Sequence, residues 1–437
     1  MIEKEVFITL NEWEEVHPEP GSPTDGLRLP PDKKVRELAF RLNRERKVRV
    51  LSLDNGIYIK SFSYVGIVRF GNLRVVIKPK IPYLPLLNLF RYAYGFRKLQ
   101  LYSNLEYETG GESLQDLLIR QMILETDELI ARGLHKQYIQ LNARLSFLRG
   151  KIDFQKFAYQ GGVVAASIPC IYHPRYEDGI LNQFIKAGLK IGIALTNDMS
   201  LRYELRRRVA LFDEFISDIQ IDRQVYRNLR MKMNRLSRAY EPVIMLISIL
   251  LDSSGILFEV KSEQGPKLPG FLFDMNRFFQ TVVSRFLSEN LQGYQVRDEY
   301  GLKSMISYIE EFNPKKKISP KPRPDFVIFK DNRINAILDA KYRNLWTTDL
   351  PRDMLYQLSI YALSQKSVRE SAILYPDIGE GAKIAKLEIK DPVYSGRHAV
   401  VTLRPLNLLK LNDYISDPVG TRKERERFAE YLAFGEN

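Results

Sequence analysis

Two short apolar runs joined by a turn constrain the fold of this chain more than any other feature. The runs are Phe326–Phe329 and Ile334–Leu338, and the turn signal Asp331-Asn332 lies between them. Apolar runs of this length, bounded by turn residues, are typical of buried β-strands, and a tight turn joins antiparallel neighbours. The sequence therefore predicts a buried β-hairpin over residues 325–342.

Charged residues gather at the open end of this hairpin. Asp325 precedes the first strand, and Asp339 and Lys341 follow the second. Residues two apart in an extended segment point to the same face, so Asp339 and Lys341 share one face. The hairpin brings both of them back beside Asp325. A charged residue that ends a buried strand needs a partner or a metal ion, and we therefore expect the three side chains to converge.

Two carboxylates and an ammonium suit phosphodiester hydrolysis. Mg²⁺ prefers oxygen ligands and is often held by one or two carboxylates together with substrate phosphates. A bound metal lowers the pKa of its water and offsets charge on phosphorus. We predict that Asp325 and Asp339 hold Mg²⁺, and that Lys341 orients or deprotonates the attacking water or stabilises the phosphorane. The alternative is a surface hairpin with ordinary charges.

Composition narrows the class of protein. The 437 residues are 45% hydrophobic and 27% charged, which is typical of a globular chain of two or three domains. One cysteine and four scattered histidines exclude an intrachain disulfide and a zinc cluster. With no signal peptide and no apolar run long enough for a bilayer, we expect a cytoplasmic protein without a membrane partner. The net charge of +13 suits a polyanion, although charge alone is a weak indicator.

Periodicity predicts an α+β multidomain chain with three parts. Residues 1–105 form a β-rich domain with hairpins over 48–80, residues 106–265 are mainly helical, and residues 266–437 form an α/β domain. A Gly/Pro-rich boundary is expected at 265–270. The helices are expected at 31–46, 113–134, 181–193, 200–217, 223–251, 271–291, 350–364 and 421–433. The later strands are expected at 294–299, 303–311, 325–330, 334–342, 371–375, 383–389 and 398–404.

The charged hairpin resembles the PD-(D/E)xK nuclease superfamily. The resemblance is carried by Arg323-Pro324-Asp325, by Asp339-Ala340-Lys341 and by the helix that precedes them. Downstream, Gln357 and Tyr361 are one helical turn apart and look like the Gln-xxx-Tyr helix of the RecB-like branch. In that branch the glutamine supports the lysine or the metal site. The resemblance therefore implies a restriction-endonuclease-like C-terminal domain and adds Gln357 to the catalytic residues.

Further segments resemble McrC, the nuclease subunit of modification-dependent McrBC restriction systems. Together they cover most of residues 48–375, and their order is more specific than any one of them. They are Val65–Asn72 with Ile77–Ile81, Leu148–Phe154, Tyr176–Asp178 with Leu181-Asn182, and Phe273–Phe279. One departure lies in the opening helix of the nuclease domain, where many members carry a glutamate and this chain has Gln280. We therefore leave Gln280 out of the metal site.

The resemblance implies two partners, DNA and a McrB-like AAA+ GTPase ring. McrC proteins dock on this ring, their N-terminal domain enters its pore, and they stimulate GTP hydrolysis. The sequence contains no G-x-x-x-x-G-K-[ST] motif, in agreement with a nucleotide site on the partner. The pore-entering tip would lie within residues 48–80, where the basic candidates are Arg49, Lys60, Arg69, Arg74, Lys78 and Lys80. Alternatively, these charges only protect strand edges.

The predicted function is that of an Mg²⁺-dependent DNA endonuclease subunit of a restriction complex, with no small-molecule substrate. One alternative is a stand-alone repair or resolvase nuclease with the same site. Another is a non-catalytic activator of an NTPase. The basic loop over 313–324 abuts the site and is expected to position DNA phosphates. Arginines over 201–240 would contact DNA, contact the partner ring, or form a solvated helix face.

Overall fold

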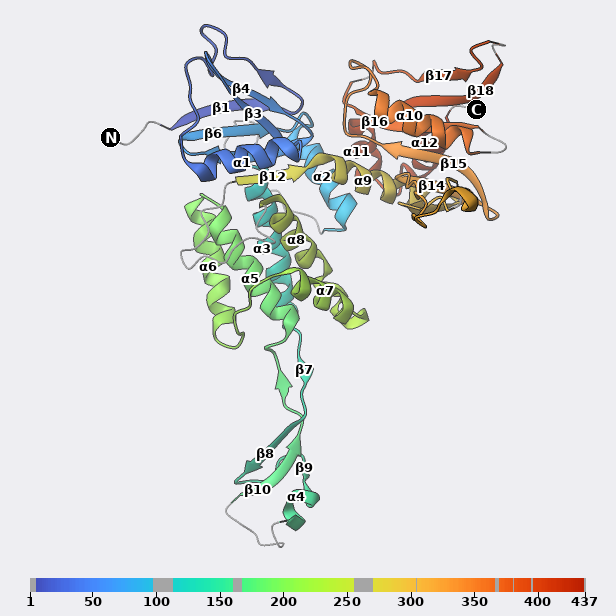
Figure 1. Cartoon of the computed structure of the whole chain (residues 1–437). Helices are drawn as coiled ribbons and strands as arrows, with labels where there is room; N and C mark the ends of the chain where they lie inside the picture. The colour runs from blue at the N-terminus through green and yellow to red at the C-terminus, as the bar shows by residue number, and fades with distance from the viewer. Residues whose placement is uncertain are drawn as a thin grey trace. The chain divides into compact units, whose positions relative to one another are not determined.

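The computed structural model describes residues 5–96, 113–159, 167–254, 270–303, 305–365, 369–379, 381–393 and 396–435. The chain divides into two compact units (Figure 1). One unit combines Met1–Lys98 with Leu272–Asn437, and the other is Leu99–Phe271. The domain boundaries predicted near residues 105 and 265 lie outside the described residues. In the described residues, no helix is both long and apolar enough to cross a membrane.

The N-terminal part of the first unit is built from two small sheets. Strand β5 (Tyr64–Phe70) and β6 (Leu73–Lys78) are antiparallel, and β1 (Val6–Asn11) runs parallel to β6. With β12 (Gly270–Asp274) they give the order β1-β6-β5-β12. The second sheet, of order β2-β4-β3, contains the expected 48–61 hairpin. The remaining bounds are β2 Glu15–Val16, α1 Lys33–Arg44, β3 Val48–Leu53, β4 Gly56–Ser61 and α2 Tyr83–Tyr94.

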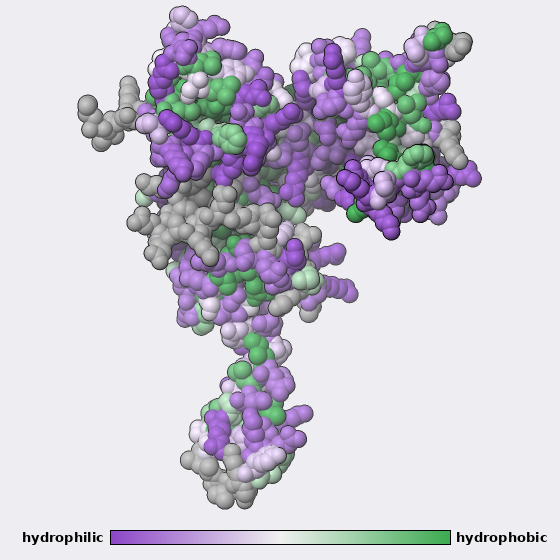
Figure 2. All heavy atoms as spheres, in the orientation of Figure 1, coloured by the Kyte–Doolittle hydropathy of each residue, from purple (hydrophilic) through white to green (hydrophobic). Residues whose placement is uncertain are grey.

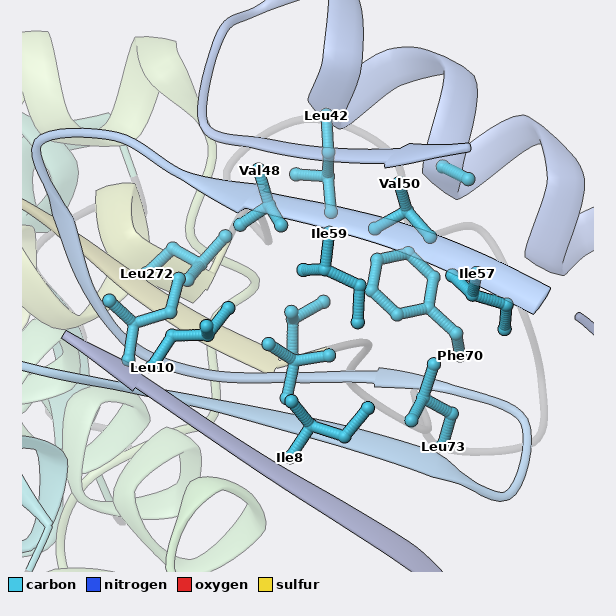
Figure 3. Close-up of a cluster of buried hydrophobic side chains, with 14 residues drawn as sticks. Ile8, Leu10, Leu42, Val48, Val50, Ile57, Ile59, Phe70, Leu73 and Leu272 are labelled. Carbon is cyan, nitrogen blue, oxygen red and sulfur yellow. The ribbon is translucent and has the colours of Figure 1, made fainter. Parts of the chain in front are cut away.

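Strand alternation explains the core of this part. Alternate residues of both sheets point inward and are buried, and they meet side chains of α1 between the sheets. Figure 3 shows Val48, Val50 and Leu42 above Ile8 and Leu10, with Phe70 among them. Leu272 of β12 belongs to the same cluster. The strand that leads into the C-terminal domain is therefore part of the N-terminal core.

The C-terminal part contains a six-stranded mixed sheet of order β13-β14-β15-β16-β18-β17. The predicted hairpin is confirmed, because Phe326 of β14 pairs with Leu338 of β15 in an antiparallel ladder. Asp331 and Asn332 have φ of 50° and 60°, as a tight hairpin turn requires. Strand β16 runs parallel to both β15 and β18. The strands are β13 Gln295–Asp298, β14 Phe326–Lys330, β15 Arg333–Ala340, β16 Glu370–Asp377, β17 Ala385–Lys390 and β18 Arg397–Asn407.

Helix α10 (Arg352–Leu363) packs on this sheet over β15, β16 and β18. Its Leu358 and Tyr361 lie in one buried cluster with Val327 and Ile337. Alternation from Val327 and Ile337 places Asp325 and Asp339 on this same face. Helices α9 (Met275–Asn290) and α12 (Arg422–Phe434) also pack against β15, and α11 (Leu408–Ser416) follows β18.

Two sequence predictions in this fold are wrong. The described residues of 303–311, which leave out 304, form no strand, and the segment runs into η3 (Glu310–Phe312). The helix expected over 223–251 is interrupted between α7 (Arg223–Lys232) and α8 (Glu241–Ser254). Asn234 and Ser237 exchange side-chain hydrogen bonds with each other's backbone amides there, and this local bonding competes with helical bonds.

The second unit is a helical bundle that carries an arm of strands (Figure 1). The bundle contains α3 (Leu114–Arg132), α5 (Ile180–Leu195), α6 (Met199–Asp213), α7 and α8, close to the expected helices. The strands of the arm were not expected. Strands β7 (Gln137–Tyr138) and β11 (Arg175–Tyr176) pair, and beyond them lies a sheet of order β8-β10-β9. Its bounds are β8 Leu141–Leu145, β9 Lys151–Ile152 and β10 Ile168–Tyr172, with α4 at Phe154–Tyr159.

Asn182 of α5 ties both ends of the arm to the bundle. Its side chain is fully buried, and its amide donates to the carbonyls of His135 (3.0 Å) and Glu177 (2.7 Å). The hydroxyl of Tyr240 donates to Asn182 Oδ1 at 2.8 Å and accepts the His135 amide at 2.6 Å. The arm therefore leaves the bundle from a root in which both chain segments are fixed.

We predict that Asn182→Ala destabilises the second unit. The substitution leaves two part-buried carbonyls without this donor, at a cost of up to about 1–3 kcal/mol each. Chemical denaturation should show a lower free energy of unfolding than for Asn228→Ala, which removes only an exposed bond to Gln224. Equal stability of the two variants would contradict this role of Asn182.

Candidate active site

The three charged residues predicted from the sequence come together in the structure. Lys341 Nζ lies 3.2 Å from Asp339 Oδ2 and 3.7 Å from Asp325 Oδ2. The backbone amide of Ala340 donates to Asp325 Oδ2 at 2.8 Å, which fixes the carboxylate across the hairpin. The antiparallel register of β14 and β15 is the cause, because it sets Asp325 opposite the end of β15.

This cluster is largely withdrawn from water. Asp339 is 3% exposed. Burial, reinforced by the negative charge of Asp339, raises the pKa of Asp325 from 3.8 to about 7, although Lys341 and the Ala340 amide oppose this. Burial alone would lower the pKa of Lys341, but the two carboxylates raise it above its ordinary value. Lys341 is therefore held as an ammonium, which favours a role as donor over a role as base.

Gln357 reaches this cluster through Tyr361. Its side-chain amide donates to the Tyr361 hydroxyl at 2.8 Å, one turn further along α10. Burial raises the pKa of Tyr361, and the nearby charges of Asp339 and Asp325 add to the shift. Gln357 thus orients a phenol that faces the carboxylates. Its assignment as a catalytic residue stays a prediction.

The backbone beside Lys341 is held by residues that sequence reasoning missed. The amide of Lys341 donates to the carbonyl of Leu374 at 3.0 Å. Asn276 Oδ1 accepts the amide of Tyr342 at 2.9 Å, and the indole of Trp13 donates to the carbonyl of Tyr342 at 3.1 Å. No local pattern announces these contacts, because they join residues that are distant in sequence.

The carboxylates fit a magnesium ion that takes most of its ligands from elsewhere. In the part of the chain that the structure describes, no group of three or more Asp, Glu, His or Cys residues could hold a metal. Burial and the neighbouring charge of Asp339 both raise the pKa of Asp325, so a bound cation would favour the ionised form of this carboxyl. Mg²⁺ commonly uses one or two carboxylates, with water and substrate phosphate as the other ligands. Gln280 donates weakly to the carbonyl of Ala340, at 3.5 Å.

Backbone hydrogen bonds next to Asp325 hold together the two ends of the segment that contains the basic loop over 313–324. Leu302 donates its amide to the carbonyl of Pro322 at 2.9 Å, and Glu299 donates to the carbonyl of Asp325 at 3.0 Å. Five basic side chains of the loop are exposed. They are Lys315, Lys316, Lys317, Lys321 and Arg323.

The basic candidates of the N-terminal hairpins have mixed surroundings. Lys60 pairs with Glu15 at 2.6 Å, and Arg49 donates to Asn43 at 3.2 Å. Arg74 lies over the ring of Phe7. The other three, Arg69, Lys78 and Lys80, are exposed. In the second unit, Arg208 is paired with Asp127 and Glu204, and Arg202 donates to the carbonyl of Thr196.

Comparison with known proteins gives a family and a fold. Residues 59–376 match the family model described as McrBC 5-methylcytosine restriction system component. A chain of the refined half-complex from the tetradecameric assembly of Thermococcus gammatolerans McrB AAA+ hexamers with bound McrC has a TM-score of 0.61 at 20% identity. That match covers 98% of this chain and 100% of the other. At this identity it shows a shared fold.

A second solved structure, the cryo-EM structure of the Thermococcus gammatolerans McrBC complex, is also similar. Its chain has a TM-score of 0.45 at 21% identity, and the match covers 65% of this chain and 88% of the other. No curated protein sequence matches this chain.

The pKa of Asp325 predicts a pH-dependent stability. The folded protein binds this proton more tightly than the unfolded chain, so the stabilisation is present at low pH and is lost between about pH 4 and pH 7. Over this range the free energy of unfolding should fall relative to Asp325→Asn. Mg²⁺ at pH 8 should stabilise the wild type and not the variant. Denaturation curves that run parallel at every pH would contradict the shift.

Proposed function

This chain belongs to the McrBC 5-methylcytosine restriction system family, and from that premise we propose that it is the subunit that cleaves DNA. One observation carries the proposal: Asp325, Asp339 and Lys341 converge at the open end of a buried hairpin, as phosphodiester hydrolysis in a PD-(D/E)xK site requires. Structural ion pairs also occur in proteins, but two buried carboxylates for one ammonium leave excess negative charge for a cation.

In this proposal each residue of the site has one task. Asp325 and Asp339 hold Mg²⁺, which lowers the pKa of bound water and offsets charge on phosphorus when it is present. Lys341 donates from its ammonium to the attacking water or to a phosphoryl oxygen. The Ala340 amide fixes Asp325, and Gln357 orients Tyr361 beside the carboxylates. The exposed lysines of the 313–324 loop bind DNA phosphates on either side of the scissile bond.

We further propose that the chain works with an AAA+ GTPase ring and stimulates its hydrolysis. The similar structure from Thermococcus gammatolerans contains McrB AAA+ hexamers with bound McrC. The present sequence has no P-loop motif, so a nucleotide-hydrolysing partner would complement it.

The arm of the second unit is the better of two docking surfaces for this ring. Large apolar side chains are exposed along it, and Figure 2 shows them as green spheres among purple ones. Phe154 is 72% exposed and Phe147 is 63% exposed, which is unfavourable in water unless a partner covers them. The hairpins over 48–80 are the alternative docking surface. They are the weaker candidate because several of their apolar residues are already buried in a core and cannot contact a partner.

We predict that Lys341→Ala abolishes DNA cleavage by the complex reconstituted with the partner ring. Loss of this ammonium should lower the rate about 10²–10⁴-fold. The variant should still fold and copurify with the ring. The matched control is Lys330→Ala, at the turn end of the same hairpin, which should cut at the wild-type rate.

The same assay separates the alternatives. Cleavage by Lys341→Ala at the wild-type rate would remove the site assignment. Cleavage by the isolated chain with Mg²⁺ alone would identify a stand-alone nuclease. Stimulation of GTP hydrolysis without any cleavage by the wild type would identify a non-catalytic activator.

We predict that Phe147→Ala with Phe154→Ala weakens binding to the ring. If the ring buries these two aromatic side chains, truncation of each should cost at least about 1 kcal/mol of binding free energy. The dissociation constant should therefore rise tenfold or more. Arg69→Ala with Lys78→Ala, on the hairpins, should bind as the wild type does. Biolayer interferometry measures both pairs, and the opposite pattern would move the docking surface to the hairpins.

A further inference from the structure

The structure joins the N-terminal sheets directly to the chain segment that carries Lys341. We propose that Trp13 is a positioning residue for Lys341, which it holds in place through the backbone of Tyr342. This inference rests on the proposed nuclease function and names a residue outside the nuclease domain that controls the site. The inference follows from hydrogen bonds to the backbone amide and the backbone carbonyl of Tyr342.

Tyr342 is the point at which the contacts meet. Its carbonyl accepts the Trp13 indole at 3.1 Å, and its amide donates to Asn276 Oδ1 at 2.9 Å. Its side chain is 3% exposed and meets the ring of Phe279 edge-on. β15 ends at Ala340, so no ladder bond to β14 holds this residue. Beyond the end of β15, the side chains of Trp13 and Asn276 form the hydrogen bonds to the backbone of Tyr342.

Trp13 is itself fixed on the N-terminal sheets. Its amide donates to the carbonyl of Phe62 at 3.3 Å, and its ring meets Phe62 edge-on. Its φ is 61°, a left-handed conformation that a bulky residue adopts only where the surroundings impose it. The guanidinium of Arg343 lies over the Trp13 ring, 5.5 Å from its centroid. The indole therefore approaches residues 342–343 in one fixed orientation.

The neighbour of Trp13 packs on the same target. Glu12 is 1% exposed, and neither of its carboxylate oxygens makes a hydrogen bond of normal geometry within the described residues. The polar groups that face it are the Tyr342 hydroxyl and the backbone of Lys80. Consecutive residues of one turn thus contact both the backbone and the side chain of Tyr342.

A second route from the N-terminal sheets ends at the same residue. Ser63, which directly precedes β5, accepts the amide of Met275 at 2.9 Å and the side-chain amide of Asn276 at 2.6 Å. Asn276 in turn accepts the amide of Tyr342. Both routes reach the residue next to Lys341, whose ammonium must stay 3.2 Å from Asp339. A displacement of the N-terminal sheets would therefore reach Lys341 through Tyr342, while the Lys341 amide stays bonded to the carbonyl of Leu374 in β16.

The test uses Trp13→Phe in the complete chain with its partner ring. Phenylalanine keeps an aromatic ring over Arg343 but removes the donor to Tyr342. Small displacements of a catalytic group can cost up to about 10²-fold in rate, so kcat should fall at least about tenfold. KM for DNA and the melting temperature should stay at the wild-type values. The chain has a second tryptophan, and Trp346→Phe is the matched control, with unchanged kcat.

Hydrogen–deuterium exchange gives a readout that needs no cleavage. In Trp13→Phe the peptides that contain residues 340–344 should exchange faster, while peptides of β5, β6 and α9 keep their protection. Wild-type kcat and wild-type exchange in the variant would overturn the inference and leave the proposed function intact. A fall in melting temperature with faster exchange throughout the N-terminal sheets would also overturn it, in favour of a purely structural role. Absence of cleavage by the wild type would instead refute the proposed function.

Discussion

The structure of the candidate site depends on the burial of two carboxylates beside one lysine. Burial and the negative charge of Asp339 raise the pKa of Asp325 to about 7, whereas the two carboxylates raise the pKa of Lys341 and keep it an ammonium. The balance of charge is two carboxylates against one ammonium, in a site that is mostly shielded from water. A divalent cation and the phosphate of a nucleic acid would complete this balance, and this physical need links the hairpin to the proposed chemistry.

The surrounding fold keeps the charged groups in register. Strand β15 lies inside a mixed sheet, with β14 on one side and β16 on the other, so the positions of Asp325 and Asp339 are set by ladders of hydrogen bonds. Beyond Ala340 the ladder to β14 stops, and side chains from the N-terminal sheets and from α9 hold the next residues. The carboxylates are thus positioned by the sheet, and Lys341 is positioned by β16 together with side chains of the N-terminal sheets and α9.

Local signals in the sequence predicted the local part of this arrangement. The apolar runs, the Asp331-Asn332 turn and the period of two were sufficient to bring Asp325, Asp339 and Lys341 together. The strand expected over 303–311 is wrong, because the described residues of this segment form a turn, a bend and the start of η3 instead. The arm was missed in part because β7, β9 and β11 have only two residues each, which is too short for a periodic signal. Trp13 and Asn276 were missed because their contacts bridge segments far apart in the chain, which no local pattern encodes.

Binding of Mn²⁺, followed by its electron paramagnetic resonance signal, tests the central claim most directly. The account predicts that the wild type removes Mn²⁺ from solution in the presence of DNA, and that Asp339→Asn does not. Asp353→Asn, an exposed carboxylate at the start of α10, should bind as the wild type does. Equal binding by the wild type and Asp339→Asn would show that the buried carboxylates are a structural ion pair and not a metal site.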